Sequence, residues 1–245
     1  QGGPARAQLE QVIRFSRLAR DNLDLSDDVL GSVSMPIRVE AHVLRGRSTG
    51  LSSFAVAVAA ALSLMFVSLF MTAGTLAVER EENVARRLLR GLVSRTTLLL
   101  EKAVLAAGCA ALVALLMLAG LALFVDLDWG RFPWWAAAAA AGALAFGAMG
   151  VAMASLAGGV RAASLVAFAV SLPIAFLALV PSGAVSPALY GFIRGVSALF
   201  PFRPALDAMN AGLSGSSGMV APLLHLAALA VAFGALARIA LQRFG

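Results

Sequence analysis

The residues best suited to binding chemistry lie in one charged segment between two long apolar stretches. Residues 78–102, VEREENVARRLLRGLVSRTTLLLEK, carry ten of the chain's charged side chains. A charged connection between two membrane spans has to lie in water, because an unpaired charge in hydrocarbon is costly. We therefore expect this segment to be a docking site for a soluble partner. An ordinary solvated loop is the alternative.

No set of residues has the spacing of an enzyme active site. The two histidines, His42 and His225, have no cysteine or carboxylate partners at metal-ligand spacing. No serine stands in a nucleophile-elbow pattern. The only lysine, Lys102, follows Glu101, so no phosphate-binding loop ends in Gly-Lys-Ser/Thr. We therefore expect no catalytic residue, no metal, no cofactor and no ATP hydrolysis by this chain alone.

A second group of residues is suited to close contact between helices. Small side chains let helix backbones approach each other, and hydroxyls in membrane helices usually bond to their own backbone. Two interpretations stay open: tight packing within one subunit, or the lining of a translocation path or subunit interface. The residues concerned are Ser68, Thr72 and Thr75, which share one helix face, and Gly147, Gly150 and Ala154.

Composition places all these residues in a membrane protein. Hydrophobic residues make up 60% of the chain and charged residues 13%, with a mean hydropathy of +0.89, whereas soluble domains average roughly 25% charged residues. The net charge of +6 comes almost wholly from arginine. The arginines cluster at the ends of apolar runs, which indicates orientation in a bilayer rather than nucleic-acid binding. The single cysteine, Cys109, is interpreted as a packing residue.

The apolar stretches predict an all-α polytopic membrane protein. A helix needs about 20 apolar residues to cross a hydrocarbon core of about 30 Å, and five stretches qualify or come close. The segments Tyr190–Phe200 and Ala205–Leu213 flank the sequence PFRP and predict two short outer helices, interfacial or re-entrant. The predicted spans cover residues 51–78, 103–125, 134–157, 162–180 and 220–241 within a permease domain of residues 50–245.

The distribution of basic residues predicts how the spans are oriented. Nine Arg and Lys residues lie in the connections on one side and three on the other, and the richer side is cytoplasmic by the positive-inside rule. Trp129, Trp134 and Trp135 flank the short turn on the opposite side, at the headgroup level that indole rings prefer. We therefore expect residues 79–102 and the C-terminus in the cytoplasm of a cell with this chain in its plasma or inner membrane.

Residues 1–49 are then expected to be the remainder of an extracytoplasmic domain. Helical spacing of apolar residues predicts an amphipathic helix over residues 5–22. Residues 33–44 alternate in part and predict a short strand or an extended lead-in to the first span. Because the chain opens QGGPAR without a signal peptide, we expect a further transmembrane helix and part of the external domain to precede it.

The charged segment resembles that of the ABC-2 type transporter permeases. In both, an acidic and basic pair ends a long span, Leu-Leu and Val-Ser steps follow, and a lysine opens the next span. This chain departs at Asn83-Val84, where Gly-Thr is common, and at Leu92, where Pro is common. The segment PFRPALDAM is also similar to the family's outer helical pair, so the resemblance covers about residues 30–245. The matching positions are Glu79, Arg80, Glu81, Leu88, Leu89, Val93, Ser94 and Lys102.

The resemblance implies the membrane subunit of an ATP-driven exporter. Such a subunit has six spans and works as a homo- or heterodimer with two cytoplasmic ABC ATPase subunits. Members with a large external domain between the first two spans match the N-terminal segment. Family substrates include drugs, lipids, polysaccharides and ions. The resemblance makes the charged segment the coupling helix that docks on the ATPase, through Glu79, Arg80, Glu81, Val84, Arg86, Arg87, Leu88 and Leu89.

Two other functions are consistent with a multi-pass membrane protein. A non-transporting scaffold or the anchor of a sensory complex would share the composition and the spans. An ion-coupled secondary transporter is disfavoured, because no acidic residue is placed deep within any predicted span.

Overall fold

The structure is a computed structural model that describes residues 14, 16, 50–82, 94–125, 127–157, 159–181, 183–216 and 218–242. The chain divides into two units, Gln1–Arg45 and Gly46–Gly245. In the first unit only Arg14 and Ser16 are described, both in helix. The other residues of the predicted amphipathic helix, and all of residues 33–44, lie outside the described residues. The fold below is that of the second unit.

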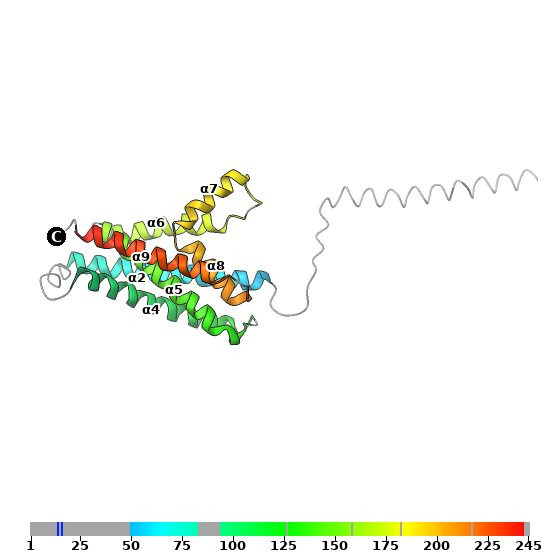
Figure 1. The fold of residues 1–245 in the computed structure, drawn as a ribbon, viewed down its shortest axis with the longest axis horizontal. Helices are drawn as coiled ribbons and strands as arrows, with labels where there is room; N and C mark the ends of the chain where they lie inside the picture. The colour runs from blue at the N-terminus through cyan, green and yellow to red at the C-terminus, as the bar shows by residue number, and fades with distance from the viewer. Residues whose placement is uncertain are drawn as a thin grey trace, which may run out of the picture. The chain divides into compact units, whose positions relative to one another are not determined.

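All regular elements in the described part of the chain are helices, which confirms the all-α class. Five of them are long and apolar enough to cross a membrane, as the apolar stretches predicted. Figure 1 shows their arrangement. The elements are α2 (Gly50–Glu81), α4 (Arg95–Leu121), the 3-10 turn η1 (Trp129–Arg131), α5 (Phe132–Leu156), α6 (Val160–Leu179), α7 (Pro187–Ala198), α8 (Phe202–Ser214) and α9 (Val220–Gln242).

Helix α5 forms the centre of the bundle. It contacts α2, α4, α6, α8 and α9, and Figure 1 shows α2, α4 and α9 running alongside it. In its most apolar stretch 67% of the residues are buried, against 11% for α9. Small side chains make this place possible, because the run AAAAAAGALAFGAMG lets neighbouring backbones approach closely. Trp135, Phe146 and Met149 are the large buried side chains of this helix.

Two glycines mark the closest approach of α5 to its neighbours. A methyl group at Gly147 would lie 3.0 Å from the carbonyl oxygen of Ala103 in α4. A methyl group at Gly150 would meet the Thr72 hydroxyl of α2 and lie 3.2 Å from the Leu69 backbone. Close-packed interiors give way only with strain, so these positions fix the separation of the helix axes.

Helix α4 begins at Arg95, well before residue 103, where the apolar stretch begins in the sequence. The Ser94 side chain caps it by accepting a hydrogen bond from the Thr97 N–H at 3.1 Å, which satisfies a backbone donor that has no partner within the helix. The first two turns therefore carry Glu101 and Lys102 inside the helix. A charged residue near a helix end does not stop the helix, although it ends an apolar window.

The two short helices expected around PFRP are present as α7 and α8. With 12 and 13 residues, each is too short to cross a bilayer. Helix α8 lies on α2 and α5 and buries Phe202, Ala205 and Met209. Helix α7 buries only Ser197, and Figure 1 shows it leaning away from the bundle. This pair therefore has one packed member and one that exposes most of its surface.

Candidate functional site

An ion pair joins the two ends of the charged segment, residues 78–102. The Lys102 ammonium lies 2.5 Å from Oε1 of Glu79 and 3.6 Å from Oε1 of Glu101. The side chains of Lys102 and Glu79 are 12% and 20% exposed, whereas that of Glu101 is 60% exposed. Because a partly buried charge is stabilised only when it is paired and hydrogen-bonded, Glu79 is the partner that allows a lysine to lie within α4.

Apolar packing holds the two partners of this pair together. Leu76, Ala77, Leu99 and Ala103 belong to one buried cluster that spans α2 and α4. The second oxygen of Glu79, Oε2, is buried and has no hydrogen-bond partner among the described residues. The last turn of α2 and the second turn of α4 are thus fixed to each other on both sides of residues 83–93.

The hydroxyl residues of α2 lie on its buried face against α5. The Ser68 hydroxyl donates a hydrogen bond across to the Ala143 carbonyl at 3.2 Å, while Thr72 bonds to the Ser68 carbonyl at 2.7 Å. Thr75 bonds to the Met71 carbonyl at 2.8 Å. Of the three residues Ser68, Thr72 and Thr75, therefore, Ser68 links two helices through its side chain, whereas Thr72 and Thr75 bond within their own helix.

The small residues of α5 lie in the same interior. Gly147 and Gly150 contact α4 and α2 as described above, and Ala154 is fully buried. This geometry corresponds to close packing within the subunit, the first of the two interpretations. A part for these residues in a translocation path or subunit interface stays a prediction.

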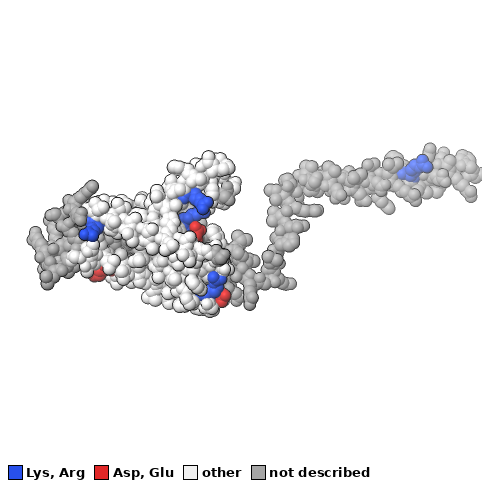
Figure 2. Space-filling view, in the orientation of Figure 1, with Lys and Arg blue, Asp and Glu red and all other residues white. Residues whose placement is uncertain are grey.

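A polar cavity lies where α7, α8 and α9 meet. Its volume is about 350 Å³. Figure 2 shows basic and acidic surface together at the base of α7, and the middle of the bundle on this face carries no charge. The cavity is lined by Arg194, Ala198, Arg203, Pro204, Asp207, Ala221, Pro222 and His225.

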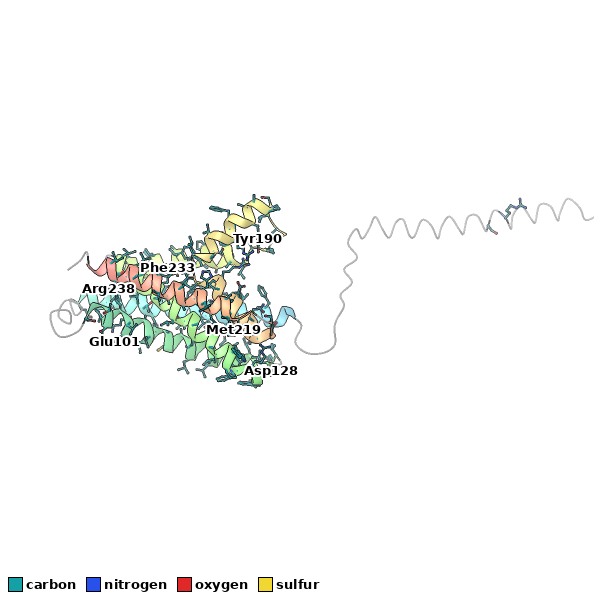
Figure 3. The ribbon with its side chains drawn as sticks, viewed as in Figure 1. Glu101, Asp128, Tyr190, Met219, Phe233 and Arg238 are labelled. Carbon is teal, nitrogen blue, oxygen red and sulfur yellow. The ribbon has the colours of Figure 1, made fainter. Side chains whose placement is uncertain are left out.

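Weak contacts leave much of this cavity's hydrogen-bonding capacity unused. Arg203 Nε lies 3.8 Å from Asp207 Oδ2, and Arg203 Nη2 lies 3.5 Å from the Tyr190 hydroxyl; both separations exceed the usual hydrogen-bond length of about 2.9 Å. Tyr190 reaches this point from α7 (Figure 3). His225 Nε2 lies 2.8 Å from the Ala198 carbonyl. Since a carbonyl only accepts, Nε2 carries the proton and Nδ1 is left for another partner.

Burial of Asp207 raises the pKa of its carboxyl group above the ordinary value, and the nearby positive charges of Arg203 and Arg194 oppose that rise. The direction shows that loss of water outweighs attraction to the guanidinium groups. Desolvation therefore disfavours the charged form of this carboxyl group, against the attraction of the two guanidinium groups.

Comparison with known families decides what kind of protein carries these features. The model of the ABC-2 family transporter proteins matches residues 5–239, almost the whole chain. The chain belongs to this family. A comparison with curated proteins gives no match. With five membrane-competent helices, this ABC-2 family member is a multi-pass membrane protein with a part in transport.

The ABC-2 assignment rests on more than the residues quoted for the coupling helix. Of those residues, Val84, Arg86, Arg87, Leu88 and Leu89 lie outside the described part. Arg80 and Glu81 end α2, and their side chains are likewise outside it. Glu79 faces Lys102, so two of the matched positions contact each other.

In the described residues no group of His, Cys, Asp or Glu could hold a metal ion.

Sequence reasoning missed the polar cavity of this ABC-2 protein. In the sequence His225 stands without partners at metal-ligand spacing, and Arg203 contributes only to the count of basic residues that predicts orientation. One signal was available: Arg203 and Asp207 are four residues apart, so they share one face of a short amphipathic helix. Nothing in the sequence places His225 beside them.

Proposed function

We propose that this chain is the membrane subunit of an ATP-driven exporter, powered by a separate cytoplasmic ATPase that docks on residues 79–89. A second permease subunit would complete the complex in the bilayer. Export is the direction that the resemblance implies. The sequence contains no phosphate-binding loop of its own, so hydrolysis falls to the partner.

The ion pair between Glu79 and Lys102 is the observation that carries this proposal. If the docking segment were not attached to the bundle, a movement of the ATPase would displace only that segment. Here both ends of residues 83–93 are tied to each other and to the buried cluster around Leu76 and Leu99. A displacement of the segment would therefore move α2 and α4 as a unit against α5, because packed helices shift as bodies rather than deform continuously.

The arrangement of charges supports a cytoplasmic position for this segment. Figure 3 shows Glu101 and Arg238 at one end of the bundle and Asp128 at the other. Arg238 of the C-terminal helix α9 thus lies at the same end as Glu101, next to the ion pair. The positive-inside rule then assigns that end to the cytoplasm.

The experiment that tests the proposal compares two substitutions in the charged segment. If the segment is helical, Val84 and Leu88 share a face with Arg87 beside them, and Arg90 points elsewhere. Buried apolar anchors carry more of an interface than rim charges, whose exposed pairs contribute less than about 1 kcal/mol. We expect Leu88→Asp to release the ATPase or to uncouple its hydrolysis from transport, and Arg90→Ala to have little effect.

Two measurements decide the outcome: co-purification of the ATPase and transport-stimulated ATP turnover. Membrane insertion and melting temperature of the variants serve as the control for folding. Wild-type behaviour of both variants would show that the segment is a solvated loop. Normal co-purification without any transport-linked turnover would favour a scaffold or sensor anchor.

A further inference from the structure

The cavity between α7, α8 and α9 has the features of a binding site that neither coupling nor helix packing requires. Its volume of about 350 Å³ falls at the lower end of ligand pockets in proteins, roughly 300–1,000 Å³. It lies apart from the Glu79–Lys102 pair, which joins other helices. Two of its lining side chains, from α7 and α8, bear guanidinium donors: Arg194 and Arg203.

The donors of Arg203 and Arg194 are the first argument for an anionic ligand. Arg203 is 24% exposed and makes only the two long contacts to Asp207 and Tyr190. Arg194 is exposed and makes no hydrogen bond or ion pair with any described residue. A guanidinium presents five N–H groups in a planar fork that matches the oxygens of phosphate. Two such groups at one cavity leave most of their donors available to a ligand.

The other polar side chains of the cavity, His225 and Asp207, leave the two guanidinium groups as its available donors. The Nε2–H of His225 is directed to the Ala198 carbonyl. Asp207 is the only carboxylate that lines the cavity among the described residues. Burial raises the pKa of its carboxyl group and the positive charges of Arg203 and Arg194 oppose that rise, so two guanidinium groups face one carboxyl group in this cavity.

Exposed apolar side chains on the helices that form the cavity are consistent with an anion that is attached to an apolar body. Phe192 and Leu199 lie on and just beyond α7, at 69% and 64% exposure, and Val220 and Leu224 of α9 are exposed to a similar degree. Each is close in sequence to a lining residue, Arg194, Ala198, Ala221 or His225. An amphiphile could place its acidic head among the arginines while its tail follows these side chains, as interfacial helices arrange polar and apolar contacts.

We propose that the cavity between α7, α8 and α9 binds the phosphate headgroup of an anionic amphiphile, through Arg194 and Arg203. The site is independent of ATPase docking and of the direction of transport. A phosphate monoester on a two-chain lipid and free inorganic phosphate share the recognised chemistry, and the experiment distinguishes them.

The test measures binding to the detergent-purified chain by native mass spectrometry. The probes are phosphatidic acid, diacylglycerol with the same acyl chains, and inorganic phosphate as competitor. We expect phosphatidic acid to bind and diacylglycerol, which lacks the phosphate, to bind at least about tenfold more weakly. Displacement of the lipid by inorganic phosphate would show that the phosphate alone is recognised; retention of the lipid would show that the tail contributes.

Arg194→Gln is the decisive variant, because the exposed side chain makes no hydrogen bond to a described residue and its loss leaves the fold intact. We expect it to weaken phosphatidic acid binding about tenfold, the usual effect of losing a charged hydrogen bond. Arg203→Lys keeps the positive charge but loses the planar guanidinium group, so it should weaken phosphatidic acid binding less than Arg203→Gln. Arg238→Gln is the matched control, since Arg238 is exposed near the C-terminal end of α9, whereas the lining residues Ala221, Pro222 and His225 lie near the beginning of that helix. Unchanged binding in Arg194→Gln, or equal binding of diacylglycerol, would overturn the site.

Discussion

The carboxylate of Glu79 and the ammonium of Lys102 lie 2.5 Å apart and join the last turn of α2 to the second turn of α4. The pair brings the chain's only lysine against a carboxylate from the preceding span. The contribution of this ion pair to stability depends on both partners, because removal of one leaves the other charged, partly buried and unpaired.

Lys102→Met should therefore destabilise the protein by roughly 1–3 kcal/mol, the range for a hydrogen bond to a charged group. Glu79→Gln in the same chain should restore most of the loss, since the amide is neutral. Glu101→Gln is the control and should change stability by less than about 1 kcal/mol, as expected of an exposed pair. The measurement is the free energy of unfolding in mixed detergent. Equal losses for Lys102→Met and Glu101→Gln would show that the pair is a surface contact.

Gly150→Ala should destabilise the contact of α2 with α5 by about 1–3 kcal/mol, because the added methyl group meets Thr72 and the Leu69 backbone. Gly108→Ala is the matched control: nothing lies within 4 Å of the added methyl group. By helix propensity alone, that change should be neutral or stabilising. Thr72→Ala combined with Gly150→Ala should recover part of the loss. Melting temperatures of the purified variants compare them, and a Gly150→Ala protein as stable as Gly108→Ala would contradict the close approach.

Ser68→Ala should cost more than Thr75→Ala. Ser68 bonds across to Ala143 of α5, whereas Thr75 bonds to Met71 of its own helix. Interhelical hydrogen bonds in membrane proteins average about 0.6 kcal/mol, so the difference is small and needs unfolding free energies measured side by side. A larger loss in Thr75→Ala would mean that the side chain of Thr75 has a role beyond its own helix.

Asp207→Asn should change how stability depends on pH. Burial raises the pKa of the Asp207 carboxyl in the folded chain. A raised folded pKa contributes stability that is fully present below the unfolded pKa of about 4 and is lost as the pH rises through the folded pKa. The asparagine variant lacks this loss. We expect its apparent melting temperature to exceed that of the wild type by more at neutral pH than at pH 4. A constant difference across that range would contradict the raised pKa.

Single cysteines test the orientation in a Cys109→Ser background. Ser94 and Gly130 are both exposed, and the positive-inside rule puts the first in the cytoplasm and the second outside. In sealed cells, an impermeant maleimide should label a cysteine at position 130 and should label one at position 94 only after the membrane is opened. The reverse pattern would invert the topology.

The number of spans and the helical class followed from the sequence because both depend on long-range averages of hydropathy. Local boundaries did not. Helix α4 begins at Arg95, outside the apolar stretch, because the Ser94 cap and the pairing of Lys102 with Glu79 let charged residues lie within the helix. A pairing between the end of one span and the beginning of the next cannot be read from either span alone.

Contacts between helices could not be predicted from the sequence either. The face shared by Ser68, Thr72 and Thr75 was visible in the sequence, yet only the structure shows that Ser68 alone bonds to another helix. The polar cavity needed the fold of α7 and α8 to bring His225 toward Arg203. Such residues lie far apart in the sequence, and none of them belongs to a motif, so the sequence offers no pattern that would predict their contact.

The burial of α5 also constrains how the protein is made. This helix has the largest buried share of the five candidate spans, so its surroundings in the membrane are its neighbours more than lipid. Helices α2 and α4 precede it in the chain, whereas α8 and α9 follow. When synthesis has reached only α6, the alanine-rich face of α5 that α8 and α9 later cover is therefore still exposed to lipid. Completion of the C-terminal helix is thus the step at which α5 becomes enclosed by its neighbours.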